Sequence, residues 1–232
     1  MELWLFLLRW IHFLAGITWI GLLYYFNFVQ TPFFAETEPA IRSGAIQKLV
    51  PRALWWFRWG AMFTFLSGIL IYLHKLAQAG LEGFFSTSYG WAITVGGTLG
   101  TIMFLNVWLV IWPNQKVVIA SATQVAQGGQ AIPEAAARGR RAALTSRTNT
   151  LFSIPMLFYM GAASHYAFFG EASAGAMIGM TIIGGLIIAA IEINALVGSQ
   201  GPTKKPLDTV SGTLWAGFIL AAILHLLFLL LF

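Results

Sequence analysis

Apolar residues fill six long stretches of the chain, and most polar residues lie between these stretches. A helix needs about 20 apolar residues to cross ~30 Å of hydrocarbon. Six stretches meet this requirement, namely residues 3–29, 53–76, 91–112, 148–169, 173–197 and 209–232. The pattern predicts an all-α fold, a polytopic membrane helical bundle of about six transmembrane helices. We expect residues 1–232 to form a single integral membrane domain.

Composition agrees with the lipid bilayer as the surrounding medium. Hydrophobic residues make up 58% of the 232 residues and charged residues only 9%, whereas a soluble domain carries about 25% charged residues. The chain has no Cys, which excludes disulfides, thiolate metal sites, iron–sulfur clusters and a covalently attached c-type haem. The net charge of +5 belongs to the loops, so no nucleic-acid partner is expected.

Lysine and arginine are divided unequally between the two predicted sides of the membrane. The loops 30–52, 113–147 and 198–208, with the span ends that face them, hold 11 of the 13 cations. Only Arg9 and Lys75 belong to the other side. The positive-inside rule places the basic loops in the cytoplasm and both termini in the periplasm. We therefore expect a multi-pass protein of the bacterial cytoplasmic (inner) membrane, whose longest loop, 113–147, is basic and partly helical.

Four histidines, each in a different span, are the main candidates for chemistry. With this topology His12, His74, His165 and His225 lie about 9, 2, 4 and 7 residues from the outer surface, at ~1.5 Å per residue. All four therefore belong to the outer half of the bilayer. An imidazole in hydrocarbon is costly and usually has a partner or a function. Facing helices commonly bind b-type haem through such rings, so we predict one or two haem b groups with these histidines as iron ligands.

The residues around the histidines leave alternatives open. Small residues lie within one or two turns of three of them: Gly217, Ala221 and Ala222 for His225, Gly161 and Ala162 for His165, and Ala15 and Gly16 for His12. They leave space for a flat macrocycle, but close helix packing favours the same residues. A buried histidine can instead make a structural hydrogen bond, and His74, next to Lys75, can anchor its span at the interface.

Arg9 precedes His12 by three residues and shares its helical face. It is a candidate partner for a haem propionate, and snorkelling to lipid phosphate is the alternative. Similar depths suggest His12 with His225 as one ligand pair and His74 with His165 as a second. The sequence assigns no catalytic residue.

Five other polar residues stand toward the basic side of the predicted spans: Asn27, Gln30, Asn106, Glu192 and Asn194. They can form an interhelical hydrogen-bond cluster or line a proton route. Nucleotide-binding and hydrolase motifs are absent from the sequence.

Four segments, RWIHFLAGITWIGLLYYFNFVQ, ALWWFRWGAMFTFLSG, FLNVWLVIWPNQKVVIA and SRTNTLFSIPMLFYMGAASHY, carry a family resemblance. They resemble the membrane domain of the bacterial membrane-bound urate hydroxylases, the urate oxidase N-terminal family. The resemblance implies a membrane oxidoreductase that hydroxylates urate to 5-hydroxyisourate and passes electrons to a cytochrome c. Within the segments lie His12, Arg58, Asn106, Asn114, Arg147, Asn149 and His165, without assigned roles.

Typical members of that family continue into a soluble cytochrome c domain, whereas this sequence ends at Phe232 and has no Cys. We therefore expect a separate cytochrome c, or another periplasmic electron acceptor, as the partner.

The leading hypothesis is a haem-b redox protein that oxidises or hydroxylates urate. The alternative is a non-catalytic or haem-carrying subunit of a larger membrane respiratory or oxygenase complex, with other membrane subunits as partners. A transporter is less favoured, because the polar residues do not gather at the midplane and no inverted repeat is visible.

Overall fold

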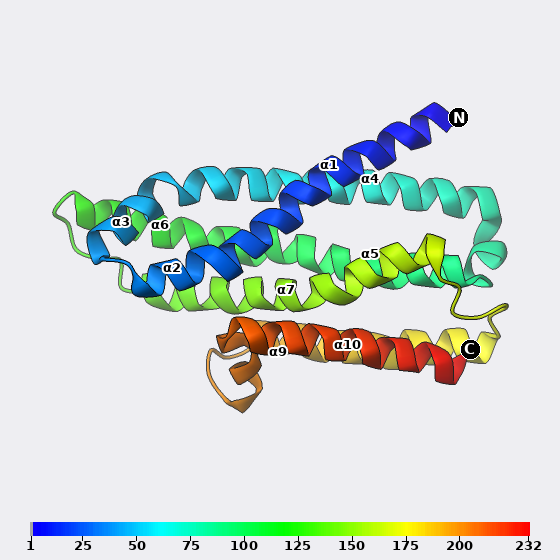
Figure 1. The fold of residues 1–232 in the computed structure, drawn as a ribbon. Helices are drawn as coiled ribbons and strands as arrows, with labels where there is room; N and C mark the ends of the chain where they lie inside the picture. Colours follow the sequence, from blue (N-terminus) through cyan, green and yellow to red (C-terminus); the bar gives the residue numbers. More distant parts are fainter. Residues whose placement is uncertain (1) are drawn as a thin grey trace.

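The computed structural model describes residues 2–232, and these residues form helices joined by short connections, without a strand (Figure 1). The first long rod consists of α1 (Glu2–Tyr24), a π-helical turn (Tyr25–Gln30) and α2 (Thr31–Glu36). The second is α4 (Val50–Phe85), and the third consists of α5 (Ser88–Leu105), a π-helical turn (Asn106–Ile111) and α6 (Trp112–Ala126).

The remaining rods follow in the second half of the chain. The fourth is α7 (Ala135–His165), the fifth consists of α8 (Ala174–Gly179), a π-helical turn (Met180–Gly184) and α9 (Gly185–Leu196), and the sixth is α10 (Val210–Leu231). Two short helices lie in the connections: α3 (Pro39–Lys48) and a 3₁₀ helix (Pro202–Asp208).

Five of these rods are long and apolar enough to cross a membrane: Leu3–Glu36, Val50–Phe85, Ser88–Ala126, Ala174–Leu196 and Val210–Leu231. The prediction of an all-helical, multi-pass membrane bundle is therefore confirmed. The sixth predicted span, 148–169, falls mainly in α7, which is not among the five. At ~1.5 Å per residue, the 31 residues of α7 are long enough to span, but its interior is more polar.

Helix α7 tolerates these polar residues because it lies at the centre of the bundle. It packs against α5, α6, α9 and α10, and Thr148, Asn149, Thr150 and Ser153 on it are fully buried. A helix surrounded by other helices does not need the apolar surface that lipid demands. The five more apolar rods instead expose many large aliphatic and aromatic side chains, such as Ile17, Leu109 and Leu230, as the surface of a membrane protein does.

Several predicted loops are largely helical. Helix α4 continues to Phe85 across a break at Gly80, whose φ of +71° is a conformation that glycine adopts readily. The basic segment 113–147 contains the end of α6 and the start of α7, so its expected helix is confirmed. The helices extend beyond the apolar stretches that defined the predicted spans.

The rods run alternately up and down, so both ends of the described chain lie at one end of the bundle (Figure 1). We call this the histidine end, because His12, His74, His165 and His225 all lie toward it. The other end, which carries α3, the α6–α7 connection and the 3₁₀ helix, is called the basic end. The unequal distribution of cations in the sequence thus corresponds to two physical ends of the fold.

Close contacts between helices determine which helices are neighbours. Helix α1 packs on α4, α5 on α7, and α10 on α7. A Cβ added at Gly60 of α4 would lie 3.1 Å from the Trp19 backbone nitrogen of α1. A Cβ at Gly217 of α10 would lie 2.9 Å from the Leu151 carbonyl oxygen of α7. Both glycines therefore permit an approach that a larger residue would prevent.

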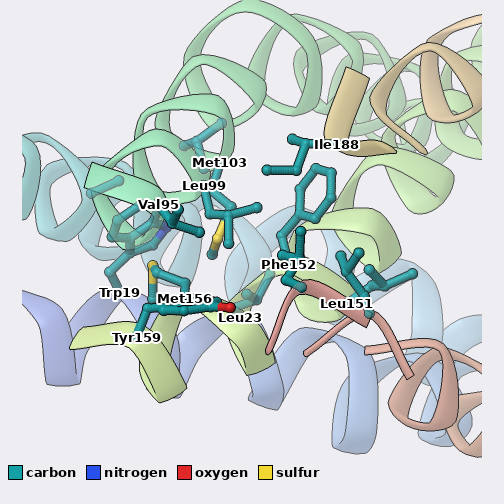
Figure 2. Close-up of a cluster of buried hydrophobic side chains, with 14 of the residues drawn as sticks. Trp19, Leu23, Val95, Leu99, Met103, Leu151, Phe152, Met156, Tyr159 and Ile188 are labelled. Atoms are coloured by element: carbon teal, nitrogen blue, oxygen red, sulfur yellow. The ribbon is translucent and has the colours of Figure 1, made fainter. Parts of the chain in front are cut away.

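The apolar core lies where α1, α5 and α7 meet, as Figure 2 shows. Trp19 and Leu23 come from α1, Leu99 and Met103 from α5, and Phe152 from α7. Trp19, Leu23, Leu99, Met103 and Phe152 are each at most 2% exposed. The same core includes Phe57 of α4 and Leu220, Leu224 and Phe228 of α10, so it joins these two helices to α1, α5 and α7.

Candidate functional site

His12, on α1, is held against α4 by two polar contacts. Its Nδ1 lies 2.9 Å from the Thr64 carbonyl oxygen and 3.2 Å from Ser67 Oγ. A Cβ on Gly68 would lie 3.0 Å from His12 Cε1, so the glycine makes room for the ring. A hydrogen bond from Nδ1–H to a carbonyl fixes the tautomer and leaves the Nε2 lone pair for a ligand, an arrangement typical of metal-binding histidines.

His225, on α10, lies among aromatic rings. Phe158, Tyr166 and Phe168, from α7 and the loop after it, have ring centroids 5.7, 5.8 and 5.3 Å from the imidazole. Its Nδ1 is buried and has no hydrogen-bond partner among the described residues. A polar atom left unpaired in an apolar environment costs stability, so this nitrogen is a candidate for an additional ligand.

The other two histidines differ from each other. His74 is half-buried on α4, and its Nε2 is buried without a partner among the described residues. His165 is the last residue of α7 and is exposed. The structure therefore offers unpaired buried ring nitrogens at His74 and His225, and an oriented ring at His12.

Helix packing does not bring together the pair His12 and His225 that similar depth suggested. His12 contacts α4 and His225 contacts α7 and its following loop. Helices α1 and α10 lie on opposite sides of α7 (Figure 1). Depth locates a residue along the membrane normal but does not determine which helices are neighbours. Within the described residues, no group of three or more His, Asp or Glu could hold a metal ion. The haem and its ligands stay predictions.

Three polar side chains meet inside the bundle, and we call them the amide–carboxylate cluster: Asn106, Asn149 and Glu192. Asn106 and Asn149 stand near the middle of the third and fourth rods, and Glu192 stands nearer the basic end of the fifth. Asn106 Nδ2 donates to Asn149 Oδ1 at 2.9 Å and to Glu192 Oε2 at 3.0 Å. Asn149 Nδ2 donates to the Met103 carbonyl oxygen at 2.9 Å. The cluster therefore joins α5, α7 and α9, and the predicted interhelical hydrogen bonding of Asn106 and Glu192 is confirmed.

The remaining polar residues of that prediction take other partners. Asn27 Nδ2 donates to Ser146 Oγ of α7 at 2.8 Å, and Asn194 Nδ2 donates to the Thr203 carbonyl oxygen at 3.2 Å. Gln30 Oε1 is buried without a partner among the described residues. Asn27 and Asn106 both stand in π-helical turns, which occur frequently at functional sites.

Sequence reasoning did not single out Asn149 and Ser146 as members of this polar network. The signal available was the polar run SRTNT at the start of the fourth predicted span. A polar run at that place also fits an interfacial span end. Only the central position of α7 shows that these side chains point at neighbouring helices.

Basic residues of α7 and the 3₁₀ helix fix the end of α9. Arg141 donates to the Leu196 carbonyl oxygen at 3.2 Å, and Lys204 Nζ donates to the Val197 carbonyl oxygen at 2.9 Å. Cations favour the last carbonyls of a helix because of its dipole. Burial, together with the nearby Arg140 guanidinium, lowers the pKa of Lys204. Arg140 itself pairs with Asp208 at 2.8 Å.

The fold and its intramembrane polar residues define a multi-pass helical membrane protein. A family model described as urate oxidase N-terminal matches residues 69–220, well over half of the chain. The chain belongs to this family and is a urate hydroxylase-like membrane protein. Comparison with curated proteins found no match, and comparison with solved structures found none either. The matched range contains the amide–carboxylate cluster, His74 and His165.

Proposed function

We propose that this protein is a haem-b redox protein of the bacterial inner membrane that hydroxylates urate and passes the electrons to an external cytochrome c. The observation that supports it most is the position of the four histidines at one end of a bundle in this family. His74 Nε2 and His225 Nδ1 are buried without a partner among the described residues, which fits nitrogen atoms that bind an additional group.

The donor set fits a haem b group, which when bound would supply one-electron transfer. His225 and His74 offer unpaired buried nitrogens. His12 has its Nδ1 fixed by the Thr64 carbonyl and can offer Nε2. His165 and Arg9 are exposed and would lie at the rim of the site.

The balance of the reaction explains why an acceptor is needed. Hydroxylation of urate by water forms a C–O bond and releases two electrons and two protons. The electrons leave toward the histidine end, which the positive-inside rule places in the periplasm, where a cytochrome c can dock. Glu192, hydrogen-bonded to Asn106, is a carboxylate that can hold a proton within the bundle.

Absorption spectroscopy of the purified full chain tests this proposal. We expect a low-spin b-type band in the reduced-minus-oxidised spectrum and one or two haem b groups per chain by pyridine haemochrome. In nanodiscs, urate should reduce added cytochrome c, and omission of either component should stop the reaction. A full chain that is folded and inserted but lacks any haem band would contradict the haem assignment.

A haem-carrying or non-catalytic subunit of a larger membrane complex is the second candidate. The separation of His12 from His225 favours it, because a ligand from another subunit could complete a site that this chain builds in part. Co-purification of other membrane proteins at fixed stoichiometry, with haem lost on dissociation, would support this candidate. Urate-dependent cytochrome reduction by the isolated chain would exclude the non-catalytic role.

A further inference from the structure

A pocket of about 430 Å³ opens at the histidine end between α1, α4 and the start of α5. Its lining residues are Arg9, Lys75, Gln78, Ala79, Gly83, Phe84, Thr87 and Tyr89. Pockets that bind small molecules measure roughly 300–1,000 Å³. The break of α4 at Gly80 falls between two groups of lining residues, Lys75 to Ala79 before it and Gly83 and Phe84 after it. The volume is therefore suitable for a small planar molecule or a lipid headgroup.

The charge of the pocket is entirely positive. Arg9 and Lys75 are the two cations that the sequence assigns to this side, and both line the same pocket from different helices. No acidic residue lines it, and neither cation forms an ion pair with the side chains described over residues 3–232. Lys75 Nζ only donates to Gln78 Oε1, at 3.2 Å. An anion bound in this hollow would be attracted by both cations.

The other lining groups suit a planar anion. Phe84 and Tyr89 contribute aromatic rings, and Gln78 contributes an amide. The pocket also lies next to two of the candidate haem ligands, since Arg9 is one turn from His12 and Lys75 adjoins His74. An anion bound there would lie on the outer side of the α1–α4 contact that holds His12.

We propose that this pocket binds an anion at the membrane surface through Arg9 and Lys75, either the soluble urate monoanion or the phosphate of a lipid headgroup. Urate as the occupant rests on the proposed function and would make the pocket the site of substrate binding. The phosphate source does not depend on that function. Both occupants require the same two cations, because each carries its negative charge on oxygen or ring atoms that guanidinium and ammonium groups recognise.

Binding measurements on the full chain in nanodiscs test the proposal. The variants are Arg9→Gln and Lys75→Gln, and the matched control is Arg52→Gln, which removes an exposed cation outside the pocket. In phosphatidylcholine nanodiscs, urate binding is measured by equilibrium dialysis. In a second arm, retention of phosphatidylglycerol is measured by native mass spectrometry. We expect each pocket variant to weaken one of these interactions on the order of tenfold or more, the loss of one charge-assisted contact, and Arg52→Gln to leave both unchanged.

The outcomes separate the pocket from the proposed function. Weaker urate binding in both variants supports the pocket as a substrate site, and weaker phosphatidylglycerol retention alone supports it as a headgroup site. Unchanged binding of both probes in folded variants would overturn the proposal, and so would a loss of haem content with urate affinity intact. The wild-type chain could show no urate-dependent reduction of cytochrome c while Arg9→Gln and Lys75→Gln still weaken phosphatidylglycerol retention. This result would contradict the proposed function and support the pocket as an anion site. Variant folding is checked by helical circular dichroism.

Discussion

The two ends of the bundle differ in how their buried polar groups are hydrogen-bonded. From the middle of the bundle toward the basic end, Asn106 donates to Asn149 and Glu192, and Arg141 and Lys204 donate to helix carbonyls. At the histidine end, buried nitrogens of His74 and His225 have no partner among the described residues. Paired groups hold helices together, whereas unpaired ones in an apolar environment are retained at a cost. The comparison fits a structural role for the amide–carboxylate cluster and the ligand-binding role that we propose for His74 and His225.

The basic end is not uniform in this respect. Arg147 is only 7% exposed, and one of its terminal nitrogens is buried without a partner among the described residues. Trp108 Nε1 is in the same situation. Gln30 Oε1 also lacks a partner among the described residues. The contrast therefore concerns His74 and His225 against the amide–carboxylate cluster and the carbonyl-bound cations, and it can be tested at single residues.

The largest effect is expected at the histidine end, for His225→Ala. If His225 binds iron, the variant should lose one low-spin b-type band completely or convert it to a high-spin band. The protein should stay inserted, because the Phe158 and Phe168 rings beside it belong to other segments. Absorption spectra of purified wild type and variant measure this.

Leu226→Ala is the matched control for His225→Ala, because Leu226 is the next residue of α10 and is 56% exposed. Retention of the complete wild-type spectrum by His225→Ala would assign His225 a structural role. The comparison between the two ends would then lose its main support.

A smaller effect is expected for Asn149→Leu in the amide–carboxylate cluster. The substitution removes the bonds to Asn106 and to the Met103 carbonyl. Interhelical hydrogen bonds in membranes contribute about 0.6 kcal/mol on average and up to ~1.7 kcal/mol, so a decrease of about 1–2 kcal/mol in unfolding free energy is expected. Unfolding in mixed micelles measures it.

The haem spectrum of Asn149→Leu should stay that of wild type, since the cluster lies away from the histidine end. Thr98→Val, at an exposed position of α5, is the control for stability and should change it little. Loss of the haem band in Asn149→Leu with full stability would reverse the roles assigned to the two ends.

The smallest effect is expected for Lys204→Met in the 3₁₀ helix. The variant loses the charge-assisted hydrogen bond to the Val197 carbonyl, which contributes about 1.5–3 kcal/mol. It also removes the cost of burying the ammonium group, the burial that lowers the pKa of Lys204, so a net loss of about 0.5–1.5 kcal/mol is expected. We expect a decrease in stability within that range, measured by the same unfolding assay. The exposed Lys205→Met should be neutral. A stable Lys204→Met variant would show that Arg141 alone is sufficient at the end of α9.

The sequence by itself determined the fold class, the alternation of the rods and the separation of a basic end from a histidine end. Apolar length and charge act locally along each span, and a bilayer converts them directly into a position and a direction. For the same reason the sequence could place His12, His74, His165 and His225 at one end, and could mark Asn106 and Glu192 as intramembrane polar groups.

The tertiary structure alone decided which helices are neighbours. The packing of α1 on α4 and of α10 on α7 keeps His12 and His225 apart, although their predicted depths are similar. The same packing buries the polar face of α7, brings Asn149 to Asn106, and directs Arg9 and Lys75 into one pocket. Neighbour relations depend on close contacts such as Gly60 against Trp19 and Gly217 against Ile154. These contacts join residues far apart in the chain, so no local pattern of apolar and polar positions contains them.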